Sequence, residues 1–215
     1  MNKLIISVDG PAGSGKEKIA KYISKKYKIY HLDSGMLYRR FAKKLLNNNI
    51  NFTDKNKVYD YLKSVKTISY RKHSSLRSEK IGSITSLISV YPNVREFINK
   101  QQRLAVLNLL KIHKGCVIDG RDIGSKVFKN AQIKLFINVK LEIRAKRRHK
   151  QLIEHGEKSI YSRILKDIKL RDKTDISRKT SPLTVPVGAV IINNSNSFKI
   201  TISQINKALS RIQNF

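Results

Sequence analysis

The sequence is poor in cysteine, in long apolar runs and in acidic residues, and each shortage excludes a class of protein. With one cysteine, Cys116, the chain cannot form an internal disulfide. We expect Cys116 to be a buried strand residue of a protein in a reducing compartment. No apolar run approaches the roughly 20 residues that cross a membrane. The N-terminus leads into a glycine-rich loop rather than a signal peptide. We therefore expect a cytoplasmic location and no membrane partner.

Acidic residues are outnumbered three to one, with 15 Asp and Glu against 45 Lys and Arg, so the formal net charge is +30. One interpretation is a polyanionic partner such as DNA or RNA. The other is a solvated basic surface, because the basic residues are spread through nearly every segment. We do not expect nucleic acid to be the main partner. An enzyme that acts on a nucleotide, which is also an anion, benefits from the same positive charge.

The pattern of apolar residues predicts an α/β fold. The 215 residues are 40% hydrophobic and 28% charged, which is typical of a globular chain with one core. Short apolar runs alternate with helically spaced ones, which favours a five-stranded parallel sheet with helices on both faces. The predicted strands are Leu4–Val8, Ile29–Leu32, Cys116–Asp119, Ile133–Val139 and Ala189–Ile192.

Helical spacing places eight helices between and beyond these strands. They are predicted at about Gly15–Tyr27, Met36–Asn47, Val58–Val65, Glu79–Val90, Asn93–Lys111, Leu141–His155, Lys158–Asp172 and Ile200–Ile212. The stretch 48–113 breaks the alternation, so we interpret it as a mainly helical insertion with at most a small hairpin near Thr67–Arg71. The stretch from Asp172 to Ser181 is polar and charged, with no helical spacing of apolar residues.

A glycine-rich loop follows the first predicted strand and runs directly into a helical pattern. Gly10–Lys16 matches G-x-x-x-x-G-K, the phosphate-binding loop. The glycines let successive N–H groups point at a phosphate, the helix adds its dipole, and Lys16 supplies a mobile charge. At the next position Glu17 stands where Ser or Thr is usual. Asp9, just before the loop, either takes part in the chemistry or only braces the loop.

Four further stretches complete a pattern that resembles one family. With Val8–Lys16, the pattern comprises Leu32–Arg39, Tyr91–Glu96, Ile118–Gly124, and Arg171–Asp175 with Arg178. In this order and spacing, the chain resembles the bacterial cytidylate kinases, P-loop nucleoside monophosphate kinases that phosphorylate CMP and dCMP. The resemblance implies one P-loop kinase domain over 1–215. It implies a core of 1–47, 114–140 and 182–215, a nucleoside monophosphate-binding insertion over about 48–113, and a helical lid with the following helices over about 141–181.

On the donor side the resemblance implies ATP with Mg²⁺. Phosphoryl transfer needs mainly positioning and charge neutralisation, so cations should converge on the phosphates. The implied ATP-binding residues are Gly10, Pro11, Ala12, Gly13, Ser14, Gly15, Lys16, Glu17, Lys18 and Arg147. The implied catalytic residues are Lys16, Asp119, Arg121 and Arg178. Asp119 would hold Mg²⁺ through water, and no direct protein ligand to a metal is expected.

The basic helix raises an alternative for its arginines. Arg144, Arg147 and Arg148 together resemble the lid that closes over ATP, but this helix is basic all round. Individual members of the three could therefore face water only.

On the acceptor side the resemblance implies a pocket for a cytidine monophosphate. The implied substrate-binding residues are Ser34, Arg39, Ser86, Arg95, Arg121, Asp122, Arg171, Asp175 and Arg178. Arg39, Arg121 and Arg178 would clamp the phosphate, since a guanidinium meets phosphate oxygens bidentately. The cytosine would lie against Asp122, Arg95, Ser86 and Ser34, and the ribose against Asp175 and Arg171. Two alternatives stay open: Arg39 as a solvated residue, and Arg171 with Asp172 as a helix-end ion pair.

The loop departs from the family at two positions. Where the family has Gly-Lys-Gly-Thr, this chain has Gly15-Lys16-Glu17-Lys18. Because Glu17 opposes an anion and the threonine hydroxyl is lost, we expect weaker ATP binding or slower turnover. We expect the double reversion Glu17→Gly and Lys18→Thr to raise activity, with Lys18 partly compensating in the natural chain. The insertion is also short for the family, since 64–77 leaves little room for three strands.

These observations give one leading function and two alternatives. The leading function is transfer of the γ-phosphate of ATP to CMP or dCMP, giving CDP or dCDP, by a monomer that needs only these small-molecule partners. The first alternative is a catalytically weakened P-loop protein with a basic nucleic-acid-binding surface. The second is a P-loop kinase for another small acceptor. The scattered arginines and aspartates favour the first function, because a nucleic-acid module has no use for such a pocket.

Overall fold

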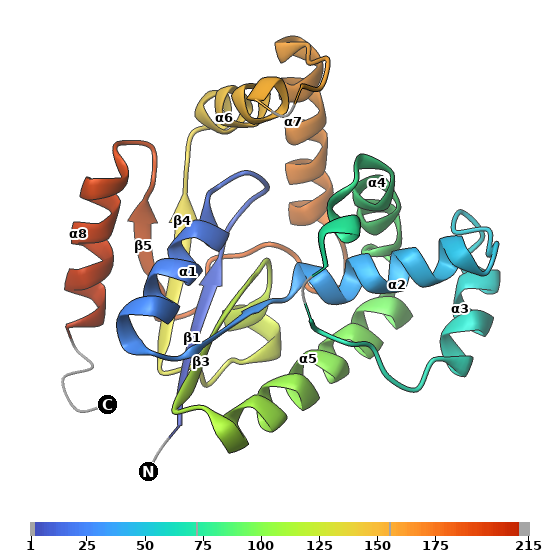
Figure 1. Ribbon diagram of the computed structural model, residues 1–215, viewed down its shortest axis with the longest axis horizontal. Coiled ribbons are helices and arrows are strands. Elements are labelled where there is room, and N and C mark those ends of the chain that lie inside the picture. Colours follow the sequence, from blue (N-terminus) through green and yellow to red (C-terminus); the bar gives the residue numbers. More distant parts are fainter. Residues whose placement is uncertain (1–2, 72, 155, 211–215) are drawn as a thin grey trace.

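Five parallel strands form one sheet in the order β2-β3-β1-β4-β5 in the computed structural model, which describes residues 3–71, 73–154 and 156–210 (Figure 1). The strands are β1 (Leu4–Asp9), β2 (Tyr30–Asp33), β3 (Gly115–Gly120), β4 (Ile133–Asn138) and β5 (Val190–Asn193). Every pairing between neighbouring strands is parallel. The predicted fold class and all five predicted strands are confirmed.

The register brings the carboxyl ends of the central strands together. Asp33 of β2 lies opposite Asp119 of β3, and Asp119 lies opposite Val8 of β1. Ligands of open parallel sheets bind at this edge, because the loops that leave the strands gather there. The fold therefore places two aspartates beside the glycine-rich loop that follows β1.

Helices cover both faces of the sheet, because each strand presents apolar side chains to both sides. On one face, α1 (Lys16–Tyr27) and α8 (Phe198–Leu209) bury residues such as Ile23 and Ile205 against Val117. On the other face, α2 (Gly35–Asn47) and α5 (Pro92–Ile112) pack against Cys116 and Ile118. Cys116 is a buried strand residue, as predicted.

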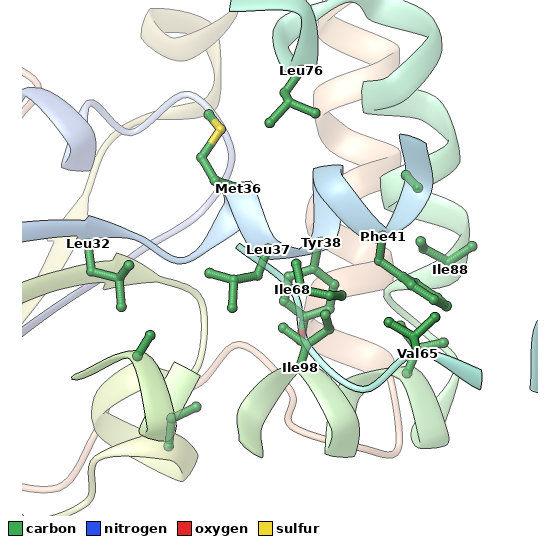
Figure 2. Packing of buried hydrophobic residues seen from close by; sticks show 14 of the residues in the cluster. Leu32, Met36, Leu37, Tyr38, Phe41, Val65, Ile68, Leu76, Ile88 and Ile98 are labelled. Carbon is green, nitrogen blue, oxygen red and sulfur yellow. The ribbon is translucent and has the colours of Figure 1, made fainter. Parts of the chain in front are cut away.

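The segment from 48 to 113 is helical and packs into the core through α2. It contains α3 (Lys55–Ser64), the 3-10 helix η1 (Ser74–Arg77), α4 (Glu79–Ile88) and α5. Figure 2 shows Phe41 of α2 beside Ile88 of α4 and Val65, within a cluster that also buries Leu76. The described part of 67–71 carries no strand, so the hairpin that was allowed there is not formed.

Two helices extend above the loop that joins β1 and α1 in Figure 1. They are α6 (Leu141–Glu154) and α7 (Tyr161–Ser177), which meet through Ala145, Ile164 and Ile168. The prediction that helical structure ends near Asp172 is wrong, because α7 continues to Ser177. Its last turn is held by the ion pairs of Asp175 with Arg121 and Arg178, which hydropathy does not reveal.

Other helix boundaries within the described residues differ from the predictions by a few residues, which is normal for helix ends. The predicted ends at His155 and Ile212 lie outside the described residues. The five-residue π-helical turn η2 (Ile123–Val127) follows β3 and was not predicted. Among the described residues, none of the helices is both long enough and apolar enough to cross a membrane.

Candidate active site

Most of the residues expected to bind ATP lie in one continuous stretch of the chain. Gly10–Gly15 form the loop after β1, and Lys16–Lys18 begin α1. Gly13 and Gly15 have φ values of 71° and 81°, a left-handed conformation that glycine adopts without strain. A Cβ on Gly15 would lie 2.6 Å from Asn194 Nδ2, which donates a hydrogen bond to the Ser14 carbonyl at 2.8 Å. The curled backbone is the local structure that a phosphate-binding loop requires.

Lys16 reaches back across this loop. Its ammonium group donates to the Pro11 carbonyl at 3.1 Å. Burial, followed by the positive charge of Arg121, lowers the pKa of Lys16 to about 7. A neighbouring anion stabilises the charged form, so a bound phosphate would return this lysine to full protonation. Lys16 is thus held where a phosphate would be neutralised.

Asp9, the last residue of β1, ties this strand to the turn that follows β3. Its two carboxylate oxygens accept the backbone N–H groups of Ile123 at 2.8 Å and Gly124 at 2.7 Å. Burial raises the pKa of Asp9 to about 7, against the opposing effect of these donors. Gly124 allows the close approach, since a Cβ there would lie 2.5 Å from Ser7 Oγ. These contacts tie the end of β1 to η2 rather than to Gly10–Gly15, so both interpretations of Asp9 stay predictions.

Arg144 braces the loop from above, through α6. Its guanidinium donates to the Ala12 carbonyl at 3.0 Å and pairs with Asp172 of α7 at 2.6 Å, and its side chain is buried. Sequence reasoning grouped Arg144 with Arg147 and Arg148 as possible lid arginines. Of these, Arg148 donates to Gln151 at 3.2 Å, and partial burial lowers the pKa of Arg147.

The residues expected to bind the acceptor come from six parts of the chain. Ser34 precedes α2, and Arg39 lies on it. Two residues lie on helices of the insertion, Ser86 on α4 and Arg95 on α5. The remaining ones follow β3 or belong to the end of α7: Arg121, Asp122, Arg171, Asp175 and Arg178. The structure brings several of them into direct contact.

A buried ion pair joins Arg95 and Asp122. The two side chains are 2.8 Å apart and are 2% and 4% exposed. Arg95 also lies over the ring of Tyr38, 5.5 Å from its centroid. Asp122 Oδ2 and Arg95 Nε have no hydrogen-bond partner among the described residues. A buried acceptor and a buried donor are therefore available side by side, and buried polar atoms of this kind normally have partners.

A second cluster joins two arginines through one carboxylate. Asp175 pairs with Arg121 at 3.0 Å and with Arg178 at 2.7 Å. Although burial acts in the opposite direction, the two guanidinium groups hold the pKa of Asp175 below its usual value. Arg178 Nη2 is buried with no hydrogen-bond partner in the described part of the chain. Two cations are thus fixed beside each other, which suits a doubly charged anion.

The other acceptor residues are held by neighbouring elements. Arg171 donates to Ser86 Oγ at 2.7 Å, which links α7 to α4. Ser34 donates to the Asp119 carbonyl at 2.6 Å. Arg39 donates to the Leu76 carbonyl at 2.9 Å, and burial lowers its pKa, so the interpretation of Arg39 as a fully solvated residue does not fit.

Asp119 has a partner that sequence reasoning missed. The His31 ring nitrogen Nε2 lies 2.6 Å from Asp119 Oδ1, and both side chains are buried. His31 and Asp33 point to the same face of the sheet as Asp119, because side chains alternate along a strand. That alternation was visible in the sequence, but the pairing of β2 with β3 was not.

Two carboxylates near the glycine-rich loop have the chemistry of magnesium ligands. Asp119 and Asp33 lie at neighbouring strand ends, and carboxylates are ligands that Mg²⁺ prefers. In the part of the chain that the structure describes, no three His, Cys, Asp or Glu side chains gather as a metal-binding group.

Glu17 and Lys18 point in different directions. Glu17 Oε1 accepts from Lys21 at 2.8 Å and from Arg77 at 2.8 Å. Partial burial acts to raise its pKa, but these two cations lower it to about 2. The Lys18 ammonium group lies 4.1 Å from the centroid of the Phe198 ring on α8. Arg77, which sequence reasoning did not single out, therefore joins the insertion to the start of α1.

Comparisons with known proteins bear on the family and on the fold of this chain. The sequence model of the family described as cytidylate kinase matches residues 6–214. A cytidylate kinase of Bartonella bacilliformis is 35% identical over 195 residues, covering 91% of this chain and 88% of its own. One of Rickettsia akari is 40% identical over 190 residues, covering 88% and 84%. The crystal structure of TT1252 from Thermus thermophilus covers all of both chains with a TM-score of 0.52 and 15% identity, which shows the fold alone.

Proposed function

Because this chain belongs to the cytidylate kinase family, we propose that it transfers the γ-phosphoryl group of ATP to CMP or dCMP, giving ADP and CDP or dCDP. The protein is on this account an ATP-dependent nucleoside monophosphate kinase. The observation that carries the proposal is the buried Arg95–Asp122 pair near Arg178, in which one donor, Arg95 Nε, and one acceptor, Asp122 Oδ2, have no hydrogen-bond partner among the described residues. Such a set suits a base that donates from N4 and accepts at N3 and O2.

The acceptor phosphate would lie between the arginines. Arg121 and Arg178 are already fixed by Asp175, and Arg39 approaches from α2. Each guanidinium can meet two phosphate oxygens, so three of them offset the charge that two phosphorylated nucleotides bring together. Asp175 and Arg171, on one helix, would meet the ribose hydroxyls. Ser86 and Ser34 would complete the wall around the base.

The donor triphosphate would lie on the loop Gly10–Gly15 and the start of α1. Lys16 would neutralise the β- and γ-phosphates, and Arg147 would approach from α6. We propose that Mg²⁺ accompanies ATP and is held through water by Asp119; it would neutralise charge on the phosphate oxygens. No side chain needs to act as a strong base, because the attacking group is an anionic phosphate oxygen.

The chain divides functionally into three parts on this proposal. The core comprises 1–47, 114–140 and 182–215, the insertion 48–113 holds the acceptor, and 141–181 forms the lid over the donor. The hydrogen bond from Arg144 to the loop supports the last assignment, since it joins α6 to the ATP side. We also propose a cytoplasmic monomer, which the buried single cysteine suits.

A coupled assay of ADP release with CMP, dCMP, UMP and AMP tests this function. The proposal predicts ADP release that depends on CMP or dCMP, with AMP the poorest acceptor. Release with AMP or another acceptor alone would favour a different small-molecule kinase. The nucleic-acid alternative would be favoured by a different result. In that case no acceptor would cause ADP release, and the protein would bind RNA or DNA tightly and with a steep salt dependence.

A further inference from the structure

Three carboxylates, on α1, β2 and β3, lie around the loop Gly10–Gly15 that we propose binds ATP. Glu17 stands in the first turn of α1, where the helix dipole and free N–H groups would otherwise serve the phosphates. Asp33 and Asp119 end neighbouring strands on the same face of the sheet. Mutual repulsion among these three groups contributes to the raised pKa of Asp33, after the larger effect of burial. A triphosphate entering here meets carboxylates as well as Lys16.

One guanidinium contacts two of these carboxylates. Arg77 Nη2 lies 2.8 Å from Glu17 Oε1 and 3.3 Å from Asp33 Oδ2. Glu17 remains ionised at neutral pH, because its pKa is about 2, so protonation cannot remove its charge. Lys18 lies over Phe198, and Lys21 reaches Glu17 from a highly exposed position one helical turn away. Arg77 is therefore the cation that bridges α1 and β2.

The position of Arg77 does not depend on these ion pairs. Leu76, its neighbour in η1, is 1% exposed in the core. The Leu76 carbonyl also accepts a hydrogen bond from Arg39. Packing and this bond hold η1 in place, as Figure 2 shows for Leu76 above Met36. The Arg77 side chain is 50% exposed, so its ion pairs contribute little to folding stability.

We propose that Arg77 is a positioning residue for the donor substrate: it neutralises Glu17 and Asp33, and so allows a P-loop with glutamate after its lysine to accept the triphosphate of ATP. The inference rests on the proposed phosphotransferase function. It assigns the compensation to Arg77 of the insertion rather than to the adjacent Lys18. On this proposal the insertion 48–113 contributes to the ATP site as well as to the acceptor site.

A double-mutant cycle tests the proposal. We would prepare Arg77→Met, Glu17→Gly and the double variant, and measure kcat and KM for ATP and CMP, together with the Kd of ATP without acceptor. In the Glu17 background, Arg77→Met should raise the Kd and KM for ATP on the order of tenfold, because an unneutralised carboxylate faces the phosphates. In the Glu17→Gly background the same substitution should raise them less than about threefold, and the KM for CMP should change less than about threefold in both.

Lys80→Met is the matched control. It removes one positive charge from the same insertion, three residues away on an exposed site of α4, and should leave the ATP constants unchanged. An equal loss on Arg77→Met in both backgrounds would overturn the proposal, since Arg77 would then act on ATP itself. A parallel rise in the KM for CMP would do the same, because it would show that η1 had moved. Thermal unfolding of Arg77→Lys and Arg77→Met identifies a folding defect, and Arg77→Lys, which keeps the charge, should retain most of the ATP affinity.

The two readouts separate this inference from the proposed function. If the wild-type protein makes no CDP, the function fails, yet the coupling of Arg77 and Glu17 is still measured by ATP binding alone. If the wild-type protein makes CDP and the cycle shows no coupling, only the inference fails.

Discussion

Lys16 combines a proposed phosphate-binding position with a pKa lowered to about 7. Burial is the largest cause, and a bound triphosphate acts against it by stabilising the ammonium form. At pH 8 the free protein therefore holds Lys16 largely neutral, and the ATP complex holds it charged. ATP binding should take up close to one proton at this pH, and affinity should fall as the pH rises above 7.

Calorimetry of ATP binding in two buffers of different ionisation enthalpy measures that proton uptake. Lys16→Met should abolish it, which separates this lysine from Asp9, whose pKa is also about 7. Proton release, or no exchange at pH 8, would contradict this assignment.

On the proposed function, the buried pair of Arg95 and Asp122 should link folding stability to recognition of the acceptor. Asp122→Ala leaves a buried guanidinium without its carboxylate, which should cost about 3 kcal/mol or more of unfolding free energy. The same change should raise the KM for CMP far more than the KM for ATP. Urea denaturation and steady-state kinetics measure the two effects.

The double variant Arg95→Met with Asp122→Leu is the control for this pair. It should recover much of the stability, because a buried ion pair is often replaceable by apolar side chains, but not the binding of CMP. A loss of less than about 1 kcal/mol in Asp122→Ala would show that water, rather than Asp122, satisfies Arg95.

At the scale of elements, the strands and helices that depend on apolar patterns could be predicted from the sequence. The segments held by polar contacts could not. The five strands and the covering helices follow from alternation and helical spacing, and the structure confirms them. The last turn of α7 was missed because ion pairs hold it, from Asp175 to Arg178 three residues on and to Arg121 on another element, and hydropathy reveals neither. The π-helical turn η2 was missed because it is fixed by Asp9 from β1.

The candidate site divides in the same way. The glycine loop and the acceptor residues could be named from motifs, but their roles in this chain stay predictions until measured. His31 and Arg77 could not be named, because each depends on a neighbour 88 or 60 residues away. The expected gain from Glu17→Gly with Lys18→Thr also stays a prediction. Since Lys21 and Arg77 already offset the charge of Glu17, most of the gain in activity should come from the restored threonine hydroxyl.

Helix α6 supports the donor loop through Arg144, and this contact can be tested. Arg144→Met removes the bond to the Ala12 carbonyl and leaves Asp172 without its cation. We expect a stability loss of about 2 kcal/mol, a higher KM for ATP and faster amide exchange in 10–16. Lys150→Met, a highly exposed position on the same helix, should change none of these. Unchanged exchange in the loop of Arg144→Met would show that α6 does not support it.

At the scale of the whole molecule, the net charge of +30 and the converging arginines serve one purpose on this account. Two anionic nucleotides must meet end to end, and a positive field raises the rate at which they arrive. The cations in the site are fixed by Asp175, Asp122 and Asp172, so the charge is arranged rather than merely abundant. A phosphotransferase site explains that arrangement, and a surface for nucleic acid does not.

The most direct test follows the phosphoryl group itself. The wild-type protein would be incubated with ATP labelled at the γ-phosphate, CMP and Mg²⁺, and the labelled products separated. The account predicts label in the β-phosphate of CDP, in amounts equal to the ADP formed. Label found only in inorganic phosphate, or retained in ATP, would contradict it.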